Sequence, residues 1–264
     1  MSVIKFQKKA IFFTDSGKGK AIVLIHGFTE SSRIWKPFTA ELSKKFRVIC
    51  IDLPGHGKSD CVAGVHSMDL VAEVVYTLLK KLKIGKCLMT GHSMGGYVTL
   101  AFAAKHPEML RGFCLFHSHC FPDTPAEQEN RNRTIGIVDQ DKFGFVAQFI
   151  PGLFPVGVHK KFSKSIEKLI HQSAKMSKDG IIAALEGMKT RPDQTELLKS
   201  TKLPVLFILG LKDPKAPLAR LWEMISLPEI SQVLTLRDVG HMGYIEAPEV
   251  TLSALSEFAR KTMD

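Results

Sequence analysis

The chain contains no long hydrophobic run and little cysteine. No apolar stretch in its 264 residues approaches the roughly 18 residues that a membrane-spanning helix needs, so we expect no membrane span. The 5 cysteines are an odd number without a CxxC spacing, which favours free thiols in a reducing compartment over a disulfide framework. The N-terminal segment carries lysines but no sustained apolar stretch, so we expect no signal peptide and a cytoplasmic location.

A long basic run is also absent, although the formal net charge is +10. The lysines and arginines stand in small groups with few aromatic residues among them, as at Lys80, Lys81, Lys83 and Lys86. A nucleic-acid-binding surface needs a basic stripe together with a known motif, so we expect no nucleic-acid partner. The apolar share of 45% and the charged share of 23% are those of an ordinary globular protein.

Short apolar runs and amphipathic segments alternate along most of the chain. Strands are expected at Ile4–Lys9, Ile11–Asp15, Ala21–Ile25, Arg47–Leu53, Cys87–Thr90, Arg111–Phe116, Val205–Leu209 and Val233–Leu236. A continuous apolar run such as Ala21–Ile25 favours a strand that is buried on both faces of a sheet. The amphipathic segments favour helices; they are Ser31–Lys45, Met68–Leu82, Met94–Lys105, Pro217–Leu227 and Pro248–Thr262. This alternation favours crossover units and a mostly parallel sheet.

The alternation stops after His117 and resumes near Thr201. The segment between them contains helical patterns at Phe143–Phe149, His159–Met176 and Asp179–Lys189, but no convincing strand. Because the strand pattern returns afterwards, we expect one α/β core domain, residues 1–117 and 201–264, interrupted by a helical cap, residues 118–200.

The clearest chemical signal is Gly91-His92-Ser93-Met94-Gly95, a G-x-S-x-G sequence between a predicted strand and a predicted helix. In that context the motif forms a sharp turn that holds the serine in a strained conformation with its hydroxyl exposed. The helix that begins at Met94 directs its free N–H groups and the positive end of its dipole toward the turn. We therefore expect Ser93 to act as a nucleophile.

A serine hydroxyl is a poor nucleophile until a neighbouring base accepts its proton. His241 follows the last predicted strand, where a triad in the order Ser, acid, His places its base. Asp213 follows the preceding strand and would orient the imidazole of His241. Asp123, after the strand Arg111–Phe116, is an alternative acid.

Acyl transfer also needs backbone donors that face the oxygen on which negative charge develops. We expect one donor to be the N–H of Met94, directly after the nucleophile. The second donor is expected in the loop after the strand Ala21–Ile25, at the N–H of Phe28, since Gly27 allows that loop to approach the substrate closely.

Together these motifs resemble the α/β-hydrolase superfamily, in its capped form with a serine nucleophile. The resemblance is carried by His26-Gly27-Phe28, Asp52-Leu53-Pro54-Gly55-His56-Gly57-Lys58-Ser59, Gly91-His92-Ser93-Met94-Gly95-Gly96, Asp213 and Gly240-His241. It implies an α/β-hydrolase fold with an eight-stranded, mostly parallel sheet, an antiparallel first hairpin, flanking helices and a helical cap insertion. It also implies that the segment around His56 shapes the flank of the site and is structural.

Four further residues are candidates for the lining of a substrate pocket: His117, His119, Phe149 and Met242. The first two end a core strand at the edge of the sheet where ligands bind in open α/β folds. Two histidines in an HxH spacing can bind zinc, but no other ligands stand at metal spacing, so we expect neither a metal nor a cofactor.

These features favour a carboxylesterase-like serine hydrolase that cleaves a small carboxylic ester through a Ser-His-Asp triad and an acyl-enzyme. The expected partner is a small-molecule ester or a related acyl compound, and the sequence does not indicate an oligomeric state. The same triad would also serve a carbon–carbon bond hydrolase or a lyase. An α/β-hydrolase-fold protein that binds a ligand or signals is the alternative of a different class.

Overall fold

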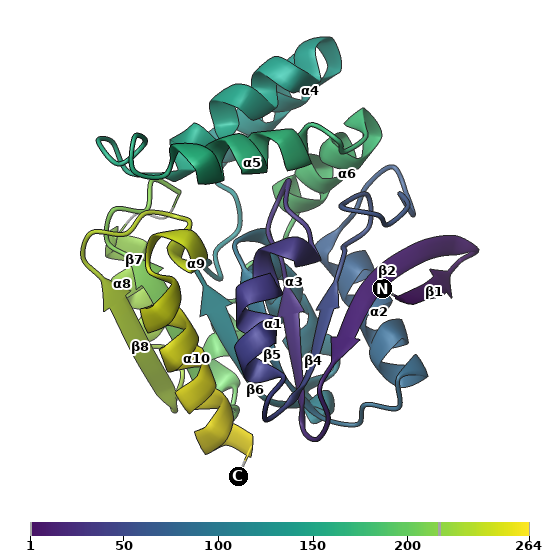
Figure 1. Cartoon of the computed structure of the whole chain (residues 1–264), viewed down its shortest axis with the longest axis vertical. Coiled ribbons are helices and arrows are strands. Elements are labelled where there is room, and N and C mark those ends of the chain that lie inside the picture. Colours follow the sequence, from purple (N-terminus) through teal and green to yellow (C-terminus); the bar gives the residue numbers. More distant parts are fainter. Residues whose placement is uncertain (1, 216–217, 264) are drawn as a thin grey trace.

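The computed structural model describes residues 2–215 and 218–263, and its strands form a single sheet (Figure 1). The strands are β1 (Ser2–Phe6), β2 (Lys9–Ser16), β3 (Ala21–Ile25), β4 (Arg47–Ile51), β5 (Cys87–His92), β6 (Leu110–Phe116), β7 (Val205–Gly210) and β8 (Ser231–Leu236). They lie in the order β1-β2-β4-β3-β5-β6-β7-β8. β2 pairs antiparallel with both β1 and β4, and the other neighbours pair in parallel. The expected eight-stranded, mostly parallel sheet is thus confirmed.

Burial along the strands explains why the sequence alternates so little between apolar and polar residues. Every residue of β3, β5 and β7 is buried, as expected for central strands that are covered by helices on both faces. β8 lies at the edge of the sheet, and its residues alternate between exposed and partly buried positions up to Leu236, which is buried.

Helices cover both faces of this sheet. They are α1 (Lys36–Leu42), α2 (Met68–Lys81), α3 (Met94–Lys105), α8 (Leu218–Ile225), α9 (Gly243–Glu246) and α10 (Pro248–Met263). In Figure 1, α1 and α10 lie on the near face, whereas α2, α3 and α8 lie behind the sheet. Pro217, the first residue of one predicted helix, lies outside the described residues. No helix within residues 2–215 and 218–263 is both long enough and apolar enough to cross a bilayer.

The insertion between β6 and β7 contains α4 (Pro125–Phe149), α5 (Ser163–Ser173), α6 (Lys178–Lys189) and α7 (Thr195–Ser200), and residues 118–200 include no strand. Asp141 interrupts α4 with a φ of −144° and a ψ of 81°, which are not helical, and the predicted helix Phe143–Phe149 is the part that follows this kink. The part before the kink was not predicted. Thr124 and Glu127 form a capping box with Pro125 at the first helical position, and this starts α4 early. The part of α4 before Asp141 shows little apolar periodicity because Val138 is its only buried residue.

Hydrogen bonds join the insertion to loops that follow the strands of the core. The carbonyl of Leu153 accepts from the N–H of His241 at 3.0 Å, and the hydroxyl of Ser173 donates to the carbonyl of Thr29 at 2.7 Å. In Figure 1, α4, α5 and α6 form a layer above the sheet. The insertion therefore covers the edge of the sheet at which the motif residues lie.

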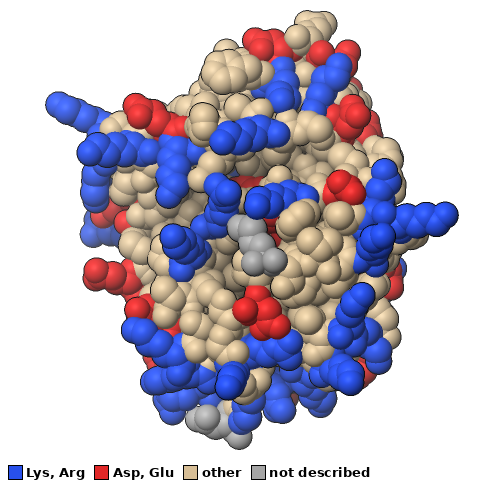
Figure 2. Space-filling view, turned by 45° about the vertical axis from the view of Figure 1, so that its right-hand side comes forward, with Lys and Arg blue, Asp and Glu red and all other residues tan. Residues whose placement is uncertain are grey.

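The positive charge of the chain is spread over its surface. On the face shown in Figure 2, lysine and arginine side chains are distributed among acidic ones and are denser toward the lower end. Several form exposed ion pairs, such as Lys44 with Glu41 and Lys202 with Glu229. All 5 cysteines lie in the described residues and none forms a disulfide.

Candidate active site

Ser93 occupies a tight turn between β5 and α3. Its φ of 51° and ψ of −117° are unusual for a residue with a side chain. A Cβ at Gly91 would lie 2.1 Å from the carbonyl oxygen of Gly95, and a Cβ at Gly95 would lie 2.5 Å from that of Ile25. Both positions therefore require glycine, and the turn places Ser93 in contact with the cavity.

The structure brings Ser93, His241 and Asp213 together in one line of hydrogen bonds. Nε2 of His241 lies 2.8 Å from Oγ of Ser93, and Nδ1 of His241 lies 2.8 Å from Oδ2 of Asp213. A carboxylate can only accept, so the proton of the neutral imidazole belongs on Nδ1. Nε2 is then free to accept the hydroxyl proton of Ser93.

Asp213 is held in its ionised form. Its side chain is 1% exposed, and this burial opposes ionisation. The neighbouring imidazoles of His241 and His117 outweigh burial and keep the pKa of Asp213 well below its usual range. Nδ1 of His117 lies 3.4 Å from Oδ2 of Asp213 without the alignment of a hydrogen bond, whereas the N–H of Lys215 donates to Oδ1 at 2.8 Å.

The loop that carries His241 is fixed on both sides of that residue. The carboxylate of Glu246 accepts hydrogen bonds from the N–H groups of Gly240 and Met242, each at 2.9 Å. The N–H of His241 itself donates to Leu153 of the insertion. Glu246 was not predicted as a site residue, although its place five residues after His241, in the first turn of α9, was a signal.

The two expected oxyanion donors flank Ser93. Met94 is the first residue of α3, where N–H groups have no acceptor within the helix. Phe28 follows Gly27, at which a Cβ would stand 3.2 Å from Cβ of Ser93. Among the residues that the structure describes, nothing accepts a hydrogen bond from the N–H of Phe28. Both N–H groups are thus available beside the serine.

A buried ion pair connects these parts of the site. Nδ1 of His92 lies 3.0 Å from the carboxylate of Glu30, and Nε2 of His92 donates to the carbonyl of His241 at 2.9 Å. Glu30 also accepts from the N–H of Gly27 at 2.6 Å and from the hydroxyl of Tyr244 at 2.8 Å. Since both ring nitrogens of His92 face acceptors, the imidazole carries two protons and a positive charge.

Electrostatics favours the same protonation states. Burial opposes both charges, but the imidazolium of His92 lowers the pKa of Glu30 to about 2. The carboxylate of Glu30 likewise raises the pKa of His92 against the effect of its burial. Neither Glu30 nor His92 was predicted to have a role in the site. Glu30 was detectable only as an acidic residue in the loop next to the predicted oxyanion donor.

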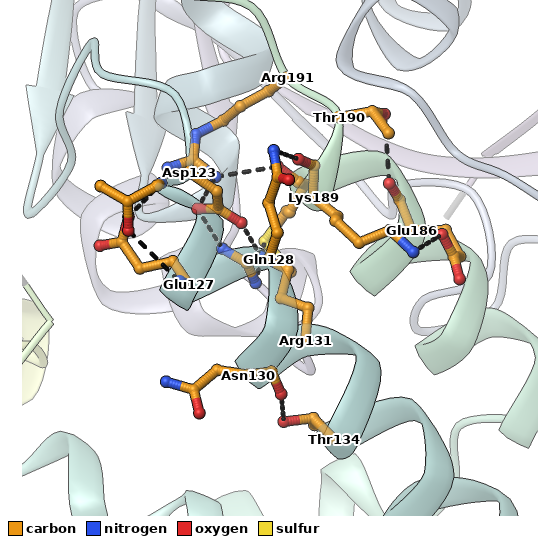
Figure 3. A network of polar contacts seen from close by, with 12 residues as sticks. Asp123, Glu127, Gln128, Asn130, Arg131, Thr134, Glu186, Lys189, Thr190 and Arg191 are labelled. Atoms are coloured by element: carbon orange, nitrogen blue, oxygen red, sulfur yellow. Dashed lines mark hydrogen bonds and ion pairs between the residues drawn. The ribbon is translucent and has the colours of Figure 1, made fainter.

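Asp123, the alternative acid, lies elsewhere in the site. Its carboxylate accepts hydrogen bonds from the guanidinium groups of Arg131 and Arg191, and both arginines point toward it in Figure 3. It is the carboxylate of Asp213, by contrast, that bonds to the imidazole of His241.

A cavity of about 420 Å³ opens at Ser93 and His241. Of the four predicted pocket residues, His119 and Phe149 line it. His117 and Met242 do not, because both are buried beside it; the ring of His117 packs against Gly243, and Met242 is 0% exposed. His117 directly follows β6 and has a φ of 48°, and its Nδ1 lies beside Oδ2 of Asp213.

His56, which the resemblance marks as structural, lies on the flank of the site. Its Nδ1 donates to the carbonyl of Pro54 at 2.9 Å, and its ring centroid is 5.2 Å from that of His26. Burial lowers the pKa of His56 to about 3, so the ring is neutral. His26 in turn accepts from the N–H of Leu53 at 3.0 Å and thereby joins two loops of the core.

The fold and this arrangement define an α/β-hydrolase. Residues 20–248, most of the chain, match the model of the alpha/beta hydrolase fold family. The chain therefore belongs to that family. The superfamily resemblance and the fold class are thereby confirmed.

Known proteins of several activities are similar to this chain. A thermophilic esterase from Thermogutta terrifontis, solved with malate bound, is 35% identical with a TM-score of 0.91, and the match covers 96% of this chain and 94% of that one. The enol-lactonase from Burkholderia xenovorans shares the fold at 22% identity with a TM-score of 0.90, over 97% of this chain and 99% of that one. The pimeloyl-(acyl-carrier protein) methyl ester esterase of Aeromonas hydrophila is 26% identical over 92% of this chain and 96% of its own length.

Several other curated relatives are considerably longer, and the chain spans between 16% and 64% of their lengths. The family, the Thermogutta terrifontis esterase and the Aeromonas hydrophila esterase together support a hydrolase.

Proposed function

We propose that this chain is a serine hydrolase that cleaves a small carboxylic ester, with Ser93 as nucleophile, His241 as general base and Asp213 as the acid that orients the base. The observation that supports this most directly is the pair of 2.8 Å hydrogen bonds that His241 makes to Ser93 and to Asp213. The esterases among the relatives support an ester as the substrate.

In the first half of the reaction, Nε2 of His241 takes the hydroxyl proton as Oγ of Ser93 bonds to the carbonyl carbon of the ester. The carbonyl oxygen becomes negative and accepts hydrogen bonds from the N–H groups of Phe28 and Met94. The bond to the alcohol then breaks, and the leaving alkoxide receives the proton from His241. The acyl group remains on Ser93 as an ester.

In the second half, His241 takes a proton from water, and the resulting hydroxide attacks the acyl carbon. The tetrahedral oxygen again meets the N–H groups of Phe28 and Met94. When the bond to Oγ breaks, His241 returns the proton to Ser93 and the carboxylic acid leaves. The carboxylate of Asp213 stabilises the imidazolium in each half and keeps its ring in place.

We also propose that residues 118–200 act as a cap on a core formed by residues 1–117 and 201–264. The insertion supplies apolar side chains to the cavity, among them Phe145, Phe149 and Leu153. Phe149 packs edge-on against Phe28 with ring centroids 5.5 Å apart, so the cap adjoins the proposed oxyanion donor. Selectivity for the acyl or alcohol group would then depend on the cap.

A panel of p-nitrophenyl esters with rising acyl length tests the function. We expect saturable hydrolysis by the wild type and loss of turnover in Ser93→Ala. Ser253→Ala, at an exposed position of α10, is the matched control and should retain the wild-type rates. Hydrolysis that persists unchanged in Ser93→Ala would remove Ser93 from the mechanism.

A further inference from the structure

The cavity at Ser93 has one apolar wall and one strongly charged wall. The charged wall is formed by Asp123, Glu127, Arg131, Arg191 and Lys215. A cavity that accepted only hydrocarbon groups would gain nothing from these side chains, because charges that lose water without a partner are costly. The charged side chains therefore either bind a polar group of the substrate or only stabilise the fold around the cavity.

Asp123 does not use all of the donors that surround it. Arg191 directs Nε to the carbonyl of Phe121 and Nη1 to Asp123 and to the carbonyl of Met188. Within the described part of the chain, its Nη2 has no acceptor. Arg131 donates from Nε and Nη2 to Asp123. The only acceptor near its Nη1 in the described residues is the sulfur of Met188 at 3.7 Å, and a thioether sulfur is a weak acceptor. The ion-pair cluster therefore retains N–H donors for a further acceptor.

The charges of the wall do not balance. Three cationic side chains, Arg131, Arg191 and Lys215, line the cavity with two carboxylates, Asp123 and Glu127, which leaves one positive charge. Two charged neighbours outside the lining, Arg220 beside Glu127 and Asp213 near Lys215, cancel each other and leave that net charge unchanged. His119 does not alter the sum, since burial and the nearby Arg191 lower its pKa to about 3 and keep the ring neutral.

Lys215 carries the unmatched charge. No ion pair joins its Nζ to a carboxylate within residues 2–215 or 218–263, although the ionised Asp213 attracts it from further away, and its Nζ lies 5.2 Å from the centroid of the Phe149 ring. It belongs to the same loop as Asp213, two residues further on, and lines the cavity together with His241.

The charged wall lies close to the nucleophile. The guanidinium carbon of Arg191 stands 4.2 Å from the centroid of the Tyr97 ring. Tyr97 lies in the first turn of α3, which begins directly after Ser93, and Ser93, Tyr97 and Arg191 line the same cavity. A substrate that bonds to Ser93 therefore needs only a short arm to reach the wall.

We propose that this wall, through Arg131, Arg191 and Lys215, binds a carboxylate of the substrate, so that the preferred substrates are esters with a free carboxylate a few bonds from the scissile bond. The proposal rests on the proposed ester hydrolysis and names its substrate class. The bound carboxylate balances the positive charge of the wall and accepts from the unused guanidinium N–H groups.

Two pairs of matched esters test the proposal and distinguish where the carboxylate sits. The acyl-side pair is the mono-p-nitrophenyl ester of glutaric acid against p-nitrophenyl pentanoate. The alcohol-side pair is butyryloxyacetic acid against ethyl butyrate, and the hydrolysis of both is measured by the acid released in a pH-stat. We expect kcat/KM for the charged member of at least one pair to exceed that of its neutral partner by about tenfold.

The ratio of charged to neutral kcat/KM is then measured in variants. Lys215→Met and Arg131→Gln should each lower this ratio by about tenfold, chiefly through KM. Lys212→Met is the matched control: it removes a lysine of the same loop that lies outside the cavity and pairs with Asp238, and it should leave the ratio unchanged. Lys215 is exposed at the cavity, so its variant tests the proposal even if Arg131→Gln fails to fold.

The outcomes separate this proposal from the proposed function. Wild-type hydrolysis of the neutral esters at equal or higher kcat/KM than the charged ones overturns the carboxylate site and leaves the esterase standing. A ratio that is unchanged in Lys215→Met overturns the assignment of the wall. Absence of hydrolysis of all four esters by folded protein contradicts the proposed function itself.

Discussion

His92, the residue before the serine of the turn, donates a hydrogen bond from Nε2 to the backbone carbonyl of His241 at 2.9 Å. Its other ring nitrogen faces Glu30, which also holds the N–H of Gly27. One buried imidazolium therefore links the serine turn, the loop of the proposed oxyanion donor and the loop of the proposed base. The three parts come from segments that are far apart in the sequence.

Removing the negative partner of this pair should weaken both stability and turnover. In Glu30→Gln the imidazolium of His92 loses its counter-ion in a fully buried position, which typically costs about 3–5 kcal/mol of unfolding free energy. We expect that loss in urea denaturation, together with a fall in kcat that exceeds any rise in KM, because the loops shift relative to one another. Glu41→Gln, which removes an exposed ion pair, should cost less than about 1 kcal/mol. Equal losses in the two variants would refute this role of Glu30.

The stabilisation from the pair should depend on pH in both directions. Glu30 has a lowered pKa, so its contribution is complete above its ordinary value of 4.5 and is lost as the pH falls toward about 2. His92 has a raised pKa, so its contribution is complete below its ordinary value of 6.5 and declines as the pH rises above it. The difference in unfolding free energy between the wild type and a Glu30→Gln/His92→Gln double variant should therefore be largest between pH 4.5 and 6.5. A difference that is flat from pH 3 to 9 would contradict the charged state of the pair.

The two candidate acids should fail in different ways. Asp213→Asn removes the acceptor that fixes the tautomer of His241, and we expect kcat to fall by about 10⁴-fold with the fold retained. Asp123→Asn leaves the buried guanidinium of Arg191 and the partly buried one of Arg131 without their shared carboxylate, so we expect its main effect to be a loss of several kcal/mol of unfolding free energy. Steady-state kinetics and urea denaturation of both variants separate these outcomes. A larger loss of kcat in Asp123→Asn would reverse the assignment of the acid.

The turn at Ser93 should tolerate no added methyl group. A Cβ at Gly91 would stand 2.1 Å from a backbone oxygen, which cannot move without opening the turn. We expect Gly91→Ala to yield insoluble protein or to lose more than about 4 kcal/mol of unfolding free energy. Gly85→Ala is the matched control, since a Cβ there meets nothing within 4 Å, and it should change stability by less than about 1 kcal/mol. Folded, active Gly91→Ala would show that the turn is looser than described.

The sequence predicted the core and the line from Ser93 to Asp213 because both depend on local patterns. Buried strands leave continuous apolar runs, and the turn of the nucleophile leaves glycines at fixed positions around the serine. The place of His241 follows from the order of the strands. These features can be recognised without knowledge of which distant residues meet.

The sequence did not predict the features that depend on contacts between distant segments. Glu30 and His92 are 62 positions apart, and only the fold shows that they form a buried pair. The burial of His117 beside Asp213, outside the cavity lining, likewise depends on a strand and a loop that lie about 100 positions apart. The first half of α4 was missed because its surface is polar, so that the capping box at Thr124 was its main signal.

The most direct test of the account is covalent labelling of the protein with a fluorophosphonate, followed by intact-mass measurement. The account predicts one label per chain on wild-type protein, none on Ser93→Ala, and much slower labelling of His241→Ala, because the hydroxyl is reactive only when the imidazole accepts its proton. Labelling of Ser93→Ala at the wild-type rate, or no labelling of folded wild-type protein, would contradict it.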